Sequence, residues 1–87
     1  MKPYIDNNKI RIFEDTVDES ELIWHRDEED RIIESIGNTD WKIQLDNELP
    51  KSLNSEVYIK KEEWHRLIKG NGPLTLKINK IKNGKST

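Results

Sequence analysis

Short apolar blocks separated by polar residues run along the chain. Alternation with a period of two is clearest in Trp41–Leu45, where Trp41, Ile43 and Leu45 share one face, and it recurs in Leu74–Ile78. This period is typical of strands that bury one face. Seven blocks are predicted to be strands: Lys9–Phe13, Glu21–Arg26, Arg31–Ile36, Trp41–Leu45, Glu56–Lys60, Trp64–Lys69 and Leu74–Ile81.

The segments between these blocks are rich in Asp, Asn, Gly and Pro, which favour turns. Seven short strands joined by turns predict an all-β sandwich or barrel. A helix stays open as an alternative only for Asp15–Ile23. We expect one domain over residues 1–87, with residues 1–8 and 82–87 as flexible tails.

Composition supports strands, although not independently of the pattern. The chain has twelve isoleucines and no alanine, and Ile suits a pleated sheet whereas Ala is the best helix former. An AT-rich genome would give the same bias, so the block pattern carries the prediction. The absence of cysteine excludes disulfides and thiolate metal sites.

The net charge and the hydropathy of the chain argue against nucleic acid and membranes as partners. The net charge of −2 offers no general attraction for nucleic acid. No apolar stretch reaches the ~20 residues of a membrane span, and the amino terminus lacks a signal-peptide core. We therefore expect a cytoplasmic protein that binds neither nucleic acid nor membrane.

The most informative feature is a repeated tripeptide, Trp24-His25-Arg26 and Trp64-His65-Arg66. In a strand, each histidine faces one way while its Trp and Arg neighbours face the other. Asp27 shares the face of His25, about 6–7 Å further along the strand. Two histidines and one carboxylate form a ligand set that holds a divalent ion with open positions. The alternative is that these histidines only form hydrogen bonds, as isolated histidines more often do.

The first tripeptide and the residues after it resemble the first cupin motif, which runs His-x-His, a spacer, Glu, six residues and Gly. His25-x-Asp27 matches the opening, with Asp in place of the second His. Two registers follow: Asp30 takes the Glu position with Gly37 as the glycine, or Arg31 and Asn38 occupy those places. The second register has no third carboxylate.

The second cupin motif, Gly, five residues, Pro-x-Gly, two residues and His, is matched outright only by His65, with Asn54 as a substitute for the first glycine. Over Glu21–Ile78 the chain is similar to small uncharacterised cupin-like proteins of tailed phages. The stretches that carry this similarity are Trp24–Arg31, Gln44–Asp46, Leu49-Pro50 and Trp64–Gly70.

The resemblance implies a small cupin-type β-barrel or jelly roll of about seven strands, with the two motif strands side by side in one sheet. His25, Asp27 and His65 would then converge in the interior. They would bind Fe, Mn, Ni or Zn, with Asp30 as a weaker fourth ligand.

Three further residues have predicted roles outside the metal ligands. Gln44 could point into the pocket and orient a substrate, although an exposed position is the alternative. Trp24 and Trp64 should form an apolar outer patch beside arginines, which is typical of an interface. We expect a homodimer, with cover by a loop as the alternative.

Two functions follow from these expectations. One is a metal-dependent enzyme acting on a small molecule, such as an oxygenase, isomerase or lyase. The other is a non-catalytic module that binds a small ligand or a protein without metal.

Overall fold

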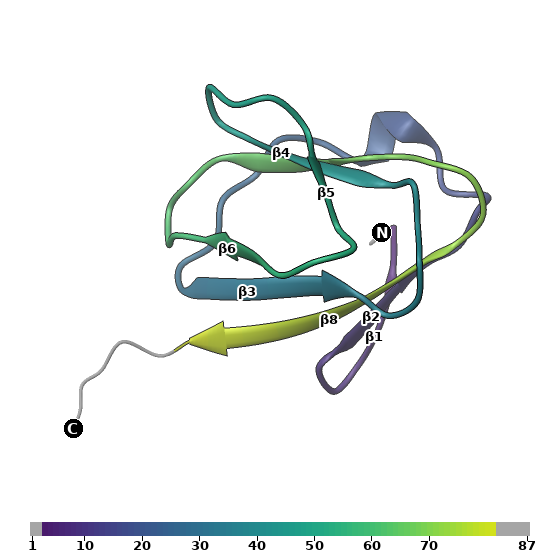
Figure 1. The fold of residues 1–87 in the computed structure, drawn as a ribbon, viewed down its shortest axis with the longest axis horizontal. Helices are drawn as coiled ribbons and strands as arrows, with labels where there is room; N and C mark the ends of the chain where they lie inside the picture. Colours follow the sequence, from purple (N-terminus) through teal and green to yellow (C-terminus); the bar gives the residue numbers. More distant parts are fainter. Residues whose placement is uncertain (1–2, 82–87) are drawn as a thin grey trace.

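A computed structural model describes residues 3–81, which form two antiparallel sheets (Figure 1). The larger sheet has the strand order β1-β2-β8-β3-β6, and the smaller sheet has the order β5-β4-β7. The strands are β1 (Ile5–Asn7), β2 (Ile10–Phe13), β3 (Asp30–Ser35), β4 (Lys42–Leu45), β5 (Lys51–Ser52), β6 (Val57–Ile59), β7 (His65–Ile68) and β8 (Leu74–Ile81). The all-β prediction is confirmed, with eight strands in the described residues in place of seven. Closure of the sheets into a barrel stays a prediction.

The predicted alternation places the core between the two sheets. In β4, Ile43 and Leu45 are buried while Lys42 is exposed, and in β8 Leu74, Leu76 and Ile78 are buried. Trp41 precedes β4 and is fully buried, with its Nε1 donating to the Gly72 carbonyl at 3.0 Å. The rest of the buried hydrophobic cluster comprises Phe13, Val17, Ile33, Leu53, Val57 and Ile59.

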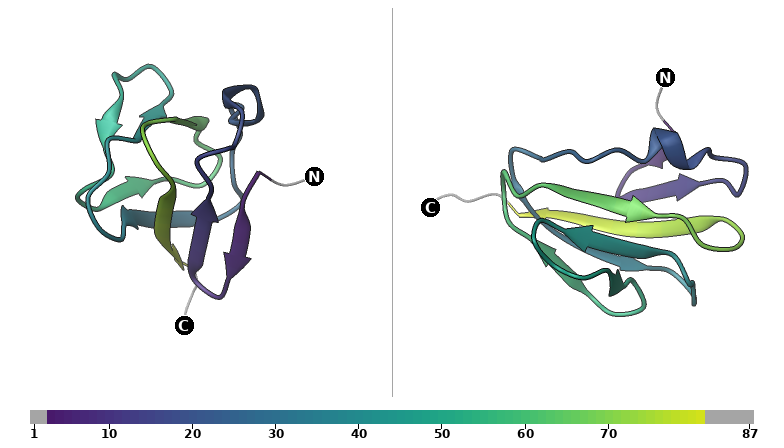
Figure 2. Two further views of the ribbon diagram at one scale, coloured as in Figure 1. Left: turned by 90° about the vertical axis from the view of Figure 1, so that its right-hand side faces the viewer. Right: turned by 90° about the horizontal axis from the view of Figure 1, so that it is seen from above.

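The first strand was not expected. Residues 1–8 were predicted to be a flexible tail, whereas Ile5–Asn7 forms β1 and pairs with β2 at one edge of the larger sheet (Figure 2). Asn8 makes the turn between them with a φ of 62°, a conformation that Asn tolerates better than most residues. The other predicted tail, residues 82–87, lies outside the described residues.

The segment Glu21–Arg26 was predicted to be a strand, and this is wrong for most of its length. A 3-10 helix covers Glu19–Glu21, with the Asp18 side chain accepting a hydrogen bond from the Ser20 backbone at its start. Only His25 pairs in the β manner, in an isolated antiparallel bridge to His65. The helical alternative for residues 15–23 therefore holds for three residues.

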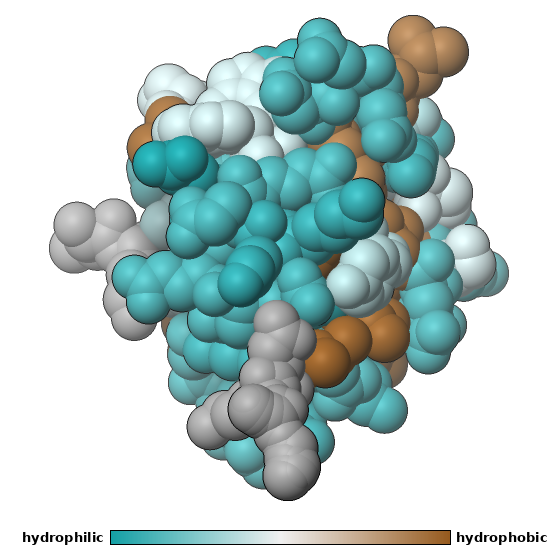
Figure 3. Space-filling model, turned by 90° about the vertical axis from the view of Figure 1, so that its left-hand side faces the viewer, coloured by the Kyte–Doolittle hydropathy of each residue, from teal (hydrophilic) through white to brown (hydrophobic). Residues whose placement is uncertain are grey.

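The surface near the end of β8, at the left of Figure 1, is largely hydrophilic (Figure 3). Within residues 3–81, no helix has the length and apolar character needed to cross a membrane.

Candidate metal centre

The two histidines lie directly opposite each other on paired backbones. The His25 N–H donates to the His65 carbonyl at 2.9 Å, and the His65 N–H donates to the His25 carbonyl at 2.9 Å. Directly opposed residues of an antiparallel pair project to the same side. The imidazole centroids are accordingly 4.3 Å apart, in an edge-to-face arrangement. The prediction that the two tripeptide segments lie side by side is confirmed at this one pair of residues.

The flanking residues of the tripeptides meet on the opposite, outer side. The Arg66 guanidinium lies 4.9 Å from the ring centroid of Trp24, and the Arg26 guanidinium lies 5.1 Å from that of Trp64. Both tryptophans are exposed, at 38% and 43%. Each tripeptide therefore supplies the aromatic ring of one cation–π pair and the cation of the other.

Gln44 belongs to this outer side. Its Oε1 accepts a hydrogen bond from Arg66 Nε at 3.0 Å, and its Nε2 donates to the Glu48 carbonyl at 3.0 Å. It is not among the residues that line the cavity described below. Gln44 is half-buried and lies outside the cavity, so its predicted role in the pocket stays without support.

Asp27 completes the cluster on the inner side. Its Oδ2 lies 3.2 Å from Nε2 of the buried His65. One potential ligand atom from each of Asp27, His25 and His65 lies within 4.8 Å of the others. The convergence of these three residues, which the family resemblance implied, is therefore confirmed.

The hydrogen bonds of the histidines fix which ring nitrogens can bind a cation. His25 Nδ1 lies 3.0 Å from the Ile23 carbonyl, and His65 Nδ1 lies 2.8 Å from the Glu63 carbonyl. A carbonyl can only accept, so each Nδ1 must carry the hydrogen. In the neutral rings both Nε2 atoms then carry lone pairs. A second hydrogen bond of this kind is what orients metal-binding histidines in general.

This arrangement creates a local need for a cation. A neutral His65 presents the lone pair of Nε2 to Oδ2 of Asp27, which is itself an acceptor. Among the described residues, this buried oxygen accepts no hydrogen bond. Either a proton on His65 or a metal ion between the two atoms removes the conflict.

The distances suit an ion. Nitrogen and oxygen ligands of Zn²⁺ lie about 2.0–2.2 Å from the metal, which puts adjacent ligand atoms roughly 2.8–3.6 Å apart in octahedral and tetrahedral sites. The 3.2 Å separation lies in this range, and ligand atoms as much as 4.8 Å apart need a side-chain movement of about 1 Å before they contact one ion. The residues present therefore fit a divalent cation.

Asp27 is held in the ionised form that a metal requires. Burial raises the pKa of its carboxyl, but the neighbouring His65 side chain and the positive charge of Arg31 lower it by more. The net pKa of Asp27 lies below its ordinary value. Arg31 Nη1 is 3.4 Å from Oδ2 of Asp27.

Of the two residues considered for a further ligand position, the structure places Arg31 at the cluster and Asp30 away from it. Oδ1 of Asp30 accepts a hydrogen bond from the Lys61 backbone at 2.7 Å, and its side chain also bonds Tyr58, which raises the pKa of that phenol. Asp30 does not belong to the group of potential ligands. The cluster thus has three ligands, with an arginine beside them.

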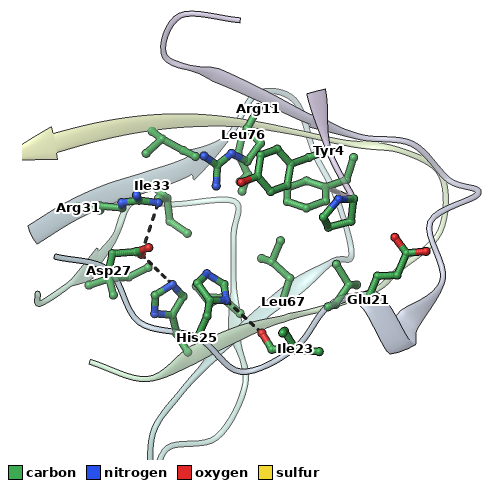
Figure 4. A pocket seen from close by; sticks show the side chains of 17 residues that line it. Tyr4, Arg11, Glu21, Ile23, His25, Asp27, Arg31, Ile33, Leu67 and Leu76 are labelled. Carbon is green, nitrogen blue, oxygen red and sulfur yellow. Dashed lines mark hydrogen bonds and ion pairs between the residues drawn. The ribbon is translucent and has the colours of Figure 1, made fainter. Parts of the chain in front are cut away.

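The ligand atoms open into a cavity of about 350 Å³ between the sheets (Figure 4). Asp27, Arg31 and His25 gather on one side of it, and Glu21 lies on the other. Its remaining lining is largely apolar and includes Phe13, Ile33, Ile43, Leu67, Leu76 and Ile78.

Four polar lining residues, Tyr4, Arg11, Glu21 and Arg31, were not predicted to line a pocket, although Arg31 was considered for the Glu position of the first motif. Strand alternation offers a signal for two of them, because Arg11 shares a face with buried Phe13 and Arg31 shares one with buried Ile33. Arg11 also stacks on Tyr4, at 3.9 Å from the ring centroid. No sequence pattern marks Tyr4, since it precedes the first strand.

Comparisons with known proteins inform the fold alone. No protein-family model matches the chain, and no curated protein matches it significantly. The fold is similar to that of protein NMB1881 from Neisseria meningitidis, known from a crystal structure, with a TM-score of 0.53. The match covers 91% of this chain and 80% of the other at 13% sequence identity. At that identity the two proteins share an architecture, and nothing follows about activity.

Proposed function

We propose that this protein is a small cytoplasmic cupin-like protein that binds one divalent metal ion through Nε2 of His25, Nε2 of His65 and the carboxylate of Asp27. The observation that carries the proposal is the orientation of the two rings. Both Nδ1 atoms face backbone carbonyls, which leaves the Nε2 lone pairs of His25 and His65 free to bind a cation. The same cluster holds Oδ2 of Asp27, which accepts no hydrogen bond from the described residues.

Two histidines and a carboxylate suit Fe(II), Mn(II), Ni(II) or Zn(II), and leave positions on the ion open toward the cavity. A bound ion would supply a Lewis acid or a binding site for oxygen, which supports a metal-dependent enzyme acting on a small molecule. The chain's own residues would orient the ligands and shape the cavity. Arg31 keeps Asp27 ionised and oriented, and the apolar walls exclude water from the ligand side of the ion.

The test is metal analysis of protein purified without an affinity tag, followed by titration of the metal-free protein with Mn, Fe, Ni and Zn. We expect one ion per chain and a higher melting temperature with at least one metal, because an ion that binds only the folded chain stabilises it. His25→Ala removes an exposed ligand without disturbing the core and should weaken binding by at least about tenfold.

Matched carboxylate variants provide the control. Asp27→Asn should weaken metal binding, whereas Glu28→Gln changes an exposed neighbour that is not in the cluster and should leave it unchanged. No co-purifying metal, together with an unchanged melting temperature for all four ions, would falsify the proposal.

A second candidate, a binding module without metal, has one observation in its favour. A protonated His65 and Arg31 can balance the charge of Asp27 without an ion. In that case the cavity would bind a small molecule in metal-free protein, and added metal would leave that binding unchanged.

A further inference from the structure

We propose that the metal-loaded cavity takes a small organic monocarboxylate, with the carboxylate at the ion and an apolar body lying along Ile33, Leu67 and Leu76. The inference rests on the proposed metal site and goes beyond it by naming the class of ligand. It depends on the charge balance of the cavity and on how polar groups are distributed around its wall.

The ligand set leaves one uncompensated positive charge. A divalent ion held by two neutral imidazoles and one carboxylate carries a net charge of +1. The cation beside it is already balanced, since Arg31 Nε donates to Glu29 at 2.7 Å. A net charge in a partly buried site is costly unless a counter-charge is bound. A monoanion supplies that counter-charge at the open positions of the ion.

The other cationic residue of the wall does not call for a second anion. Arg11 Nε donates to Oδ1 of Asp6 at 2.7 Å, and Arg11 Nη2 donates to Oδ2 of Asp6 at 3.2 Å. The two charges form a two-point ion pair at the adjacent strand. The positive charge is therefore confined to the metal side, and the opposite side of the wall carries the negative charge of Glu21.

The rest of the cavity selects the body of the ligand. Its volume of about 350 Å³ is at the small end of ligand pockets, which run roughly from 300 to 1,000 Å³. Leu67 lies between the metal side and the side that holds Glu21, and Ile33 lies beside Arg31 and Asp27 (Figure 4). An apolar chain can pack on these residues, whereas a second carboxylate would approach Glu21 and be repelled.

Four probes of graded chemistry test this in the Zn²⁺-loaded protein, with affinities measured by calorimetry. Hexanoate carries one charge and an apolar chain, hexanamide removes the charge, adipate adds a second charge, and acetate removes the chain. We expect hexanoate to bind at least about tenfold more tightly than each of the others. Equal binding of hexanoate and hexanamide, or tighter binding of adipate, would overturn the inference.

A variant tests the location. Leu67→Phe should fill part of the cavity and weaken hexanoate binding at least about fivefold, while Zn²⁺ and acetate binding stay unchanged. Leu49→Phe is the matched control, because Leu49 is 84% exposed and does not line the cavity. Unchanged hexanoate binding in a folded Leu67→Phe protein would place the ligand elsewhere and contradict the proposal.

Orientation can be read without any variant. In Mn²⁺-loaded protein, the protons on C2 of hexanoate should relax faster than its methyl protons, since the carboxylate lies at the ion. The reverse order would overturn the inference. Failure to bind Zn²⁺ or Mn²⁺ at all contradicts the proposed metal site itself, so the two proposals fail by different measurements.

Discussion

Asp27 carries a negative charge into a largely buried position, where its neighbours are two histidines and Arg31. The carboxylate comes two residues after His25, and the pairing of His25 with His65 brings it to the second ring. Arg31, four residues further on, reaches back to the same oxygen. Burial, two residues of the same short segment and one residue from a distant strand therefore determine its ionisation.

The lowered pKa of Asp27 predicts how the metal-free protein responds to acid. A carboxyl whose pKa is lower in the folded than in the unfolded state stabilises the fold above its ordinary value of 3.8, and the contribution is lost as pH falls through the folded-state value. We expect the stability advantage of the native protein over Asp27→Asn to be present at pH 6 and to disappear on acidification toward pH 2. Urea unfolding across this range measures it.

The neighbouring Glu28→Gln variant serves as the control, since Glu28 is exposed. It should retain the full acid dependence of the native protein. An advantage over Asp27→Asn that persists unchanged at pH 2 would show that the carboxylate charge does not stabilise the fold.

At the scale of elements, the repeated tripeptides bind to each other. Their antiparallel pairing puts Trp24 opposite Arg66 and Arg26 opposite Trp64, with the histidine pair between them. Two backbone hydrogen bonds and two cation–π pairs thus hold the segment before β3 against β7, although this segment is not a regular strand. These contacts on the outer side hold together the two backbone segments that carry His25 and His65, the potential ligands on the inner side.

A double-mutant cycle on Trp24→Leu and Arg66→Gln tests this pairing. We expect a coupling free energy of about 0.5–1 kcal/mol, the magnitude of an exposed cation–π pair, from urea unfolding of the four proteins. Trp24→Leu should also weaken Zn²⁺ binding, because it loosens the segment that carries His25. Independent effects of the two substitutions would mean that the contact does not stabilise the bridge.

Alternation in β8 predicts which of its residues matter for the fold. Leu74 is fully buried, so Leu74→Ala should lower the free energy of unfolding by about 2–5 kcal/mol. Lys77 in the same strand is exposed, and Lys77→Ala should change it by less than about 0.5 kcal/mol. A difference between the two urea midpoints checks the assignment of faces.

Sequence patterns predicted elements well where one face is continuously buried, as in β4 and β8. They failed for β1, because the polar pair Asn7-Asn8 reads as a tail until its hairpin partner is known. They also predicted a strand over Glu21–Arg26. The apolar residues of this segment instead flank a single β-bridge and line the cavity. In the site, alternation predicted that His25 and Asp27 share a face, and the family resemblance predicted the approach of His65. The positions of Tyr4, Arg11 and Arg31 depend on which sheet faces which.

At the scale of the whole molecule, the exposed tryptophans are the feature that suits an interface. Trp24 and Trp64 offer exposed aromatic surface flanked by arginines, a composition that is enriched at interfaces. We propose that two copies associate through this face. Sedimentation should then give a dimer, and Trp64→Ala should shift it toward monomer while Tyr58→Ala, another exposed aromatic, should not. A native protein that sediments as a monomer at high concentration contradicts the proposal.

The isolated bridge between His25 and His65 has a consequence for a chain without cysteine. An ion bound as proposed by His25, Asp27 and His65 would join two segments forty residues apart in the sequence and would act as a reversible cross-link. Such a cross-link would restrict the unfolded chain, as disulfides do in other small domains. The lifetime of the protein in a cell would then follow the supply of free metal, with chelation favouring local opening and proteolysis.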